Sequence, residues 1–225
     1  MTKTVVSVLT VIAAVVLSFI LFIAETESPS SPPSPSSPPS GTNAGPPGVP
    51  SPAEARSLLA GLVVAQPGSM SGYSRDQFPH WDSTGNSCDV RDDVLVRDGT
   101  GVTVGERCRI TGSWYSPYDD VTETDPGEVD VDHVVPLAEA WRSGASRWSI
   151  TQREAYANDL TGPILIAVTG SSNGSKSDSP PNAWLPPNTS YHCTYASMWV
   201  GAKAAYDLTV STAEVQTLSG ILNAC

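Results

Sequence analysis

The stretch EVDVDHVVPLAEAW, residues 128–141, decides the fold because it joins two patterns. Residues 128–133 alternate acidic residues with valine, which predicts a β-strand with one apolar and one acidic face and puts Asp130 and Asp132 on the acidic side. The strand ends at His133, and an apolar segment of helical composition follows. An imidazole beside a carboxylate suits acid–base chemistry, since the unperturbed pKa of histidine is about 6.5. Alone, the Asp-His pair is weak evidence for such a site.

Two segments further along the chain strengthen that interpretation. ANDL, residues 157–160, follows a helical segment, and SNGSKSD, residues 172–178, follows the apolar strand ILIAV. The order is a strand ending in Asp-His, a loop with Asn, a second strand, and a turn of the form N-x-x-K-x-D. This order resembles the HNH, or His-Me finger, endonucleases with a ββα-metal site. DVDHVVPL and NGSKSD are similar to segments of the HNH nuclease modules of RNA-guided effectors.

A wider likeness extends over most of the chain after residue 53. It is carried by the motifs YSRDQFPHW, GNSCDVRDDVL, GSWYSPYDD, AWRSGA, AYANDL and NAWLPP. Together these motifs resemble the secreted bacterial HNH endonucleases related to the GmrSD C-terminal nuclease domain. The resemblance implies an α+β fold, with a ββα-metal core, added helices and a small β-hairpin region. It also implies an exported, metal-dependent endonuclease that hydrolyses phosphodiester bonds.

The resemblance assigns roles to four residues. His133 is expected to be the general base that activates water, and Asn158 is expected to orient it by a hydrogen bond. Asp132 and Asn173 are expected to bind one divalent metal, Mg²⁺ in preference to Mn²⁺. A carboxylate and an amide oxygen suit a hard ion better than they suit zinc. Without the resemblance, Asn158 would be interpreted as a turn residue.

Other polar residues have both functional and structural interpretations. Lys176 is a candidate for substrate binding, with a solvated turn as the equal alternative. Arg91 is a second candidate, although a structural role beside the acidic strand is favoured. His80 and His192 are interpreted as structural residues. Residues 119–132 contain seven acidic residues, which predict a solvated acidic loop and do not match an EF-hand.

The charge of the chain limits how it can bind its partner. The net charge is −11, and residues 54–225 carry 21 acidic and 11 basic residues. Such a chain lacks the strongly basic surface of many nucleic-acid-binding proteins. The expected substrate is nucleic acid, with DNA favoured over RNA. Because the chain lacks a basic surface, binding should depend on a few local cations and a metal. No obligate protein partner is evident.

The amino-terminal part divides into two segments. Residues 5–24 are an uncharged apolar run long enough to cross a bilayer, so residues 1–27 are expected to be a retained anchor or, less favoured, a cleaved signal peptide. Residues 28–53 contain ten of the 20 prolines and no charged residue, which predicts a disordered linker. Residues 54–225 are then an extracytoplasmic nuclease-like domain, membrane-anchored or secreted.

Four cysteines lie in this exported part, which predicts two disulfides. Residues 93–104 contain two strand-like runs around Asp98-Gly99, which predict a β-hairpin flanked by Cys88 and Cys108. Two helices are expected near the carboxyl end, at 189–206 and from a capping box at Ser211. Antiparallel packing of these helices would bring Cys225 to Cys193. The expected pairs are therefore Cys88–Cys108 and Cys193–Cys225.

Two alternatives to a nucleic-acid endonuclease remain open. One is an inactive His-Me fold that serves as an extracellular binding module. The intact set of His, Asp and two Asn argues against this alternative, because a binding module has no need of all four. The other is a hydrolase of a different phosphodiester, for which the site chemistry would be identical.

Overall fold

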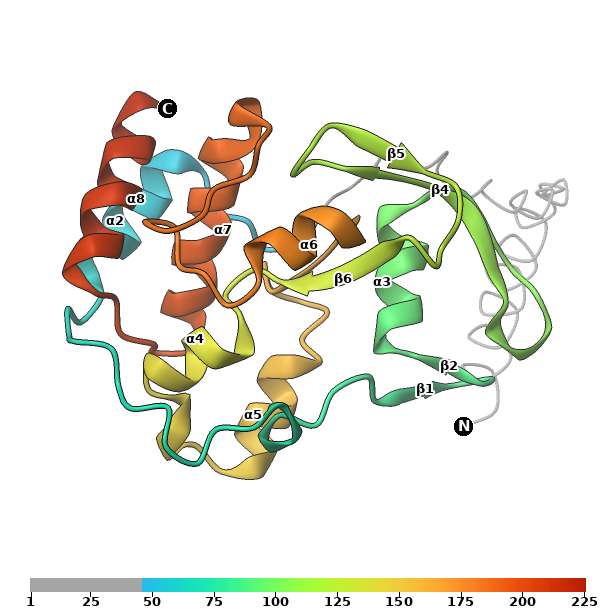
Figure 1. Ribbon diagram of the computed structural model, residues 1–225, viewed down its shortest axis with the longest axis horizontal. Helices are drawn as coiled ribbons and strands as arrows, with labels where there is room; N and C mark the ends of the chain where they lie inside the picture. Colours follow the sequence, from blue (N-terminus) through green and yellow to red (C-terminus); the bar gives the residue numbers. More distant parts are fainter. Residues whose placement is uncertain (1–45) are drawn as a thin grey trace, which may run out of the picture. The chain divides into compact units, whose positions relative to one another are not determined.

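The computed structural model describes residues 46–225. The apolar run at 5–24 and most of the proline-rich linker lie outside the described residues, and within residues 46–225 no helix is both long and apolar enough to cross a membrane. The longer elements, drawn in Figure 1, are α2 (Pro52–Gly61), β1 (Ser83–Gly85), β2 (Cys88–Asp89), α3 (Val90–Asp98), β3 (Thr100–Val104), β4 (Ile110–Ser116), β5 (Val121–Glu123), β6 (Val129–His133), α4 (Leu137–Arg142), α5 (Ile150–Ala157), β7 (Leu165–Thr169), α6 (Gly170–Lys176), α7 (His192–Ala205) and α8 (Thr212–Ala224). Four 3₁₀ turns cover Arg75–Gln77, Glu106–Cys108, Ala145–Arg147 and Thr189–Tyr191.

The centre of the fold is a ββα unit made of β6, β7 and α6. The two strands are antiparallel, with Val129 opposite Thr169 and His133 opposite Leu165. Helix α6 follows β7 directly and packs on both strands, and Figure 1 shows it lying along β6. Thr169 caps the helix by accepting a hydrogen bond from the backbone N–H of Ser172. The strand–strand–helix order implied by the resemblance is therefore confirmed, as is the α+β class, but residues 172–176, expected to form a turn, belong to a helix.

Strand β6 is buried on its acidic face as well as on its apolar face. Asp132 and His133 are each 5 % exposed, and Asp130 is half-buried. Helix α6 covers the face that carries the two aspartates, which therefore need partners inside the protein. The alternation correctly predicted a strand, but it could not show which element covers it.

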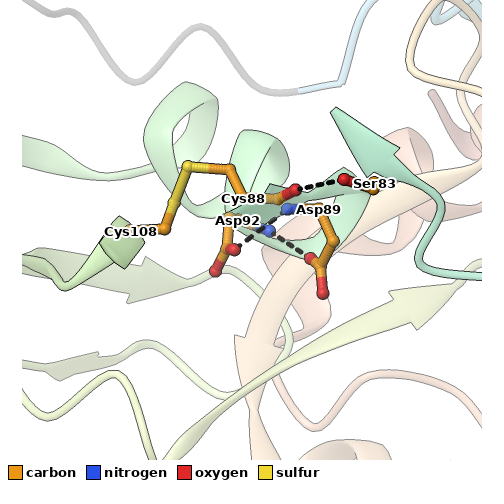
Figure 2. The surroundings of a disulfide bond; sticks show 5 residues. All are labelled: Ser83, Cys88, Asp89, Asp92 and Cys108. Carbon is orange, nitrogen blue, oxygen red and sulfur yellow. Dashed lines mark hydrogen bonds between the residues drawn. A yellow bond between two sulfur atoms is a disulfide. The ribbon is translucent and has the colours of Figure 1, made fainter. Parts of the chain in front are cut away.

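The hairpin expected at residues 93–104 is wrong, because its first half is the helix α3. Val90, Val94 and Leu95 are buried at helical spacing. Asp89 and Asp92 form a capping box, each side chain accepting a hydrogen bond from the other's backbone N–H, as Figure 2 shows beside the disulfide. Only the second run, β3, is a strand, and it pairs with β4 instead.

Helix α3 supports the ββα unit through the free edge of β7. Asp98 accepts a hydrogen bond from the backbone N–H of Ala167 at 2.9 Å, and Arg97 donates to the carbonyl of Leu165 at 2.6 Å. Arg97 and Asp98 are also bonded to each other. These contacts pair polar groups at the edge of a two-stranded sheet, which is marginally stable by itself.

Both predicted disulfides are confirmed, at Cys88–Cys108 and Cys193–Cys225. The first links the start of α3 to the turn between β3 and β4, so it does not close a simple hairpin as expected (Figure 2). The second joins α7 to the chain end after α8, as predicted from antiparallel packing. Helices α2, α7 and α8 contact one another and gather on one side of Figure 1.

A buried charge network ties this helical side to the ββα unit. The Lys203 ammonium on α7 lies 3.3 Å from Glu139 on α4 and 2.6 Å from Glu214 on α8. All three residues are at most 3 % exposed. Ser143 and Trp199 donate further hydrogen bonds to the two carboxylates. Helix α4 begins four residues after His133, so the network connects the end of β6 to the carboxy-terminal helices.

Candidate active site

A polar pocket of about 180 Å³ lies where β6 and α6 both end. Two of its walls carry Asp132, His133 and Asn173, three residues that the sequence placed in one site. The pocket thus brings together the expected general base and both expected metal ligands. The full lining is Tyr73, Arg75, Val131, Asp132, His133, Pro136, Leu137, Asn173, Ser177 and Asp178.

The His133 imidazole is held in one tautomer. Its Nε2 lies 2.9 Å from the carbonyl oxygen of Ala157, which can only accept a hydrogen bond, so Nε2 carries the proton. Nδ1 is then the nitrogen with the lone pair. Burial lowers the pKa of His133 to about 3, and the nearby positive charges add to this effect. The imidazole is therefore neutral at neutral pH, as a base that accepts a proton must be.

Asp132 is anchored by two buried groups. The Tyr118 hydroxyl donates to Oδ2 at 2.8 Å, and the Lys176 ammonium lies 2.9 Å from Oδ1. Lys176 also donates to the carbonyl of His133. Burial raises the pKa of Asp132, and the ion pair with Lys176 partly offsets that rise. A carboxylate has about four lone-pair positions, so two hydrogen bonds leave room for a further ligand.

Asn173 is oriented by the other aspartate of β6. Its Nδ2 donates to Oδ2 of Asp130 at 2.9 Å, which leaves Oδ1 as the acceptor atom of the amide. Asp132 and Asn173 both line the pocket, and both offer oxygen atoms. Carboxylate and amide oxygens are the donors that Mg²⁺ and similar hard ions prefer. This donor set therefore fits the expected divalent metal.

Asn158 does not bond to His133 directly, contrary to the expected contact. Its Nδ2 donates to the carbonyls of Pro79 and Glu154, and its Oδ1 accepts from the backbone N–H of Asp82. The neighbouring Ala157 carbonyl makes the bond to the imidazole instead. Asn158 follows α5 as its C-cap residue and is thus adjacent to the carbonyl that bonds the imidazole.

The two candidates for substrate binding have other partners in this structure. The Lys176 ammonium is fully buried on Asp132, so it is not a solvated turn residue. Arg91 donates to the carbonyls of Pro126 and Val129 at the start of β6, in line with the favoured structural interpretation. Their contacts with substrate stay predictions. His192 bonds to the carbonyl of Pro186, also as expected.

Arg75 is a pocket residue that the sequence did not single out. It is exposed and lines the pocket, and its Nε donates to Nε2 of His80 at 3.2 Å. The Nδ1 of His80 bonds in turn to the carbonyl of Phe78. His80 is thus structural, as expected, but it supports a cation at the pocket. The motif YSRDQFPHW could have pointed to Arg75 as a pocket residue, because it places this cation in one short segment with His80 and Trp81.

A cluster of residues of metal-ligand type lies elsewhere, at Cys88, Asp92 and Cys108. Figure 2 shows the two cysteines joined by their disulfide, with the Asp92 carboxylate beside it. A disulfide sulfur is not a thiolate, and the thiolate is the form that binds a metal. Asp92 also serves the helix cap. This cluster is structural.

Comparison with known proteins links the pocket to a nuclease family. Residues 95–221 match the family described as GmrSD restriction endonucleases, C-terminal domain. The chain is 51 % identical over 181 residues to an "Uncharacterized secreted protein" of the fungus Arthroderma benhamiae, covering 80 % of this chain and 89 % of the relative. This relative is fungal, so the expected bacterial assignment finds no support. No solved structure matches the chain.

Proposed function

Since this chain belongs to the GmrSD restriction endonuclease C-terminal domain family, we propose that it is an exported, metal-dependent HNH endonuclease. The single observation that carries the proposal is the pocket in which a neutral His133, Asp132 and Asn173 meet at the end of the ββα unit. The two disulfides and the secreted relative support an extracellular location.

His133 is the general base of the proposed reaction. With its proton on Nε2, the imidazole accepts a proton at Nδ1 from the water that attacks the phosphodiester. The Ala157 carbonyl then stabilises the charged ring, because a protonated imidazole strengthens its bond to an oxygen acceptor. An imidazole with the unperturbed pKa of about 6.5 would be half protonated near that pH, and only its neutral fraction could accept a proton.

Asp132 and Asn173 would hold the divalent metal, for which Mg²⁺ is the proposed ion and Mn²⁺ the alternative. When bound, such an ion stabilises negative charge on the scissile phosphate and the leaving oxygen. The role of Lys176 and Tyr118 is to keep Asp132 in one orientation. Asp130 does the same for Asn173. Partners of this kind fix the ligands before the ion arrives.

Arg75 is the proposed contact with the substrate phosphate. It is exposed at the pocket, whereas the ammonium of Lys176 is buried and Arg91 is bonded to carbonyls. DNA is the proposed substrate. Because the chain has a net charge of −11, its field repels a polyanion, so binding should be weak and should depend on Arg75 and the metal.

The deciding experiment incubates the full-length protein with plasmid, single-stranded DNA and RNA, with and without Mg²⁺. Cleavage that requires the metal and stops with chelator supports the proposal. His133→Ala should lose about 10²–10⁴-fold in rate. His192→Ala is the matched control, because His192 is outside the pocket. Equal cleavage by wild type and His133→Ala would contradict the assignment.

The same experiment separates the two alternatives. Hydrolysis of bis(p-nitrophenyl) phosphate without cleavage of any nucleic acid would favour a hydrolase of another phosphodiester. Inactivity on every substrate, in folded protein loaded with Mg²⁺ or Mn²⁺, would favour a binding module.

A further inference from the structure

The loop Pro79–Asp82 brings an aromatic ring onto the proposed general base. The Trp81 ring stacks on the His133 imidazole, with ring centroids 5.7 Å apart and planes inclined by 29°. His80 packs edge-on against the same tryptophan at 5.3 Å. This loop precedes residues 95–221, which match the family, so the match assigns it no role.

The backbone of Trp81 is in a conformation that a tryptophan rarely adopts. Its φ is +62°, in the left-handed region that glycine and asparagine occupy more easily. A bulky residue stays in this region only when its surroundings hold it there, and such strain concentrates at functional sites. Some contact must therefore force the loop into this shape.

Asn158 makes the contacts that hold the loop. One amide side chain bonds to both ends of the loop: Nδ2 donates to the carbonyl of Pro79 at 3.0 Å, and Oδ1 accepts from the N–H of Asp82 at 3.1 Å. Between these bonds lie His80 and Trp81. Ala157, the residue directly before Asn158, supplies the carbonyl that bonds to His133. The loop and the imidazole are thus fixed from one point, at the end of α5.

Two further aromatic rings contact His133. His80, in the same loop, packs edge-on against it at 6.3 Å, whereas Tyr156 lies outside the loop. Tyr156 stacks on the imidazole at 6.3 Å, is fully buried, and donates from its hydroxyl to the carbonyl of Val135. Tyr206 and Trp148 pack edge-on against it. Trp81 is only half-buried. Of the two rings stacked on the imidazole, Trp81 is the one whose position depends on the loop.

We propose that Trp81 is a positioning residue for the general base, and that Asn158 acts by clamping the strained loop that stacks Trp81 on His133. The stacked ring limits rotation of the imidazole, so that Nδ1 keeps the direction set by the Nε2 bond to Ala157. The proposal rests on the proposed function for its effect on rate, whereas the contact itself can be measured without activity.

The test compares three variants of the full-length protein. Trp81→Gly removes the ring and also relieves the backbone, because glycine accepts positive φ. Trp81→Phe keeps a ring that can stack. Asp207→Gly is the matched control, since Asp207 is exposed and has φ +50° away from the pocket. Trp81→Asn, whose side chain also tolerates positive φ, replaces Trp81→Gly if that variant does not fold.

Two readouts are needed, plasmid cleavage kinetics and NMR signals of the His133 ring. We expect kcat of Trp81→Gly to fall about 10- to 100-fold, as for a misplaced catalytic group, with KM almost unchanged. Trp81→Phe should recover most of that loss, and Asp207→Gly should match wild type. The carbon-bound protons of His133 should move downfield in Trp81→Gly, because the ring current of the indole is lost.

The outcomes separate this proposal from the proposed function. Normal kcat in Trp81→Gly, in a protein whose wild type cleaves DNA, overturns the positioning role and leaves the nuclease assignment intact. Unchanged His133 signals overturn the contact itself. A wild type without activity whose His133 signals do respond to Trp81→Gly refutes the nuclease assignment and supports the contact.

Discussion

The ammonium nitrogen of Lys176 lies 2.9 Å from Oδ1 of Asp132, and the two side chains are 0 % and 6 % exposed. Two opposite charges are therefore buried together at the floor of the pocket. Each carries a desolvation cost that the other charge offsets, with help from the Tyr118 hydroxyl and the His133 carbonyl. The pair holds the proposed metal ligand in place, but it makes the fold sensitive to the loss of either partner.

Lys176→Met should destabilise the protein by about 3–5 kcal/mol, because Asp132 would keep a buried charge without its partner. The double variant Asp132→Asn with Lys176→Met should be less destabilised, since no charge remains unpaired. Chemical denaturation of wild type and the two variants measures both effects. A double variant that is less stable than Lys176→Met would show that the ion pair is not the source of the loss.

Asp130→Ala should raise the Mg²⁺ concentration needed for half-maximal cleavage by about 10- to 100-fold, the usual cost of losing a residue that orients a metal ligand. The reason is that the Asn173 amide loses the acceptor for its Nδ2. Asp130→Asn is the control, because it keeps an acceptor oxygen at that position. An equal metal requirement in wild type and Asp130→Ala would mean that the contact of Asp130 with Asn173 does not orient a metal ligand.

Cys225→Ser should lower stability by about 3–4 kcal/mol, because the disulfide to Cys193 closes a loop of 32 residues. The folded variant should still cleave, because neither cysteine lines the pocket. Thermal unfolding and cleavage below the unfolding temperature check the two statements. Loss of cleavage in a folded Cys225→Ser sample would connect the carboxy-terminal helix to catalysis.

Asp159 should make the protein less stable in acid. Burial tends to raise the pKa of Asp159, but hydrogen bonds from Thr161, Tyr206 and Gly162 outweigh it, so the pKa is lowered. This contribution is complete above the unfolded pKa of about 3.9 and is lost as the pH falls through the lower native value. Asp159→Asn should therefore show a shallower loss of stability below about pH 4. Urea unfolding from pH 7 to pH 3 measures the difference, and parallel curves would contradict it.

Local patterns in the sequence predicted the parts of the fold that depend on neighbouring residues. The alternation at 128–133 gave β6, and the capping box of Ser211 with Glu214 gave the start of α8. The spacing of Asp132, His133 and Asn173 brought these residues to one pocket, because the ββα order fixes how two strands and a helix meet. The cysteine pairs followed from the same reasoning, although the argument for Cys88–Cys108 used a hairpin that does not exist.

Contacts between distant segments could not be predicted from local patterns. Tyr118 reaches Asp132 across 14 residues, and Asn158 reaches Pro79 across 79 residues. Helix α3 was missed for a different reason. Valines favour strands, and Asp98-Gly99 is typical of a hairpin turn, so both patterns predicted strands. The capping box of Asp89 and Asp92, which indicates the start of a helix, was not recognised. The helix is favoured over a strand because it buries Val90, Val94 and Leu95 on one face.

The network of Lys203 with Glu139 and Glu214 determines how this chain could be divided. Glu139 lies six residues after the end of β6, and its partner Lys203 is on a helix more than sixty residues later. A fragment that ended before α7 would leave Glu139 without its buried cation and with only the more exposed Arg142, and one that ended before α8 would leave Lys203 with a single carboxylate. The ββα unit therefore cannot be moved to another protein by itself. Such a transfer requires redesign of α4, or inclusion of α7 and α8.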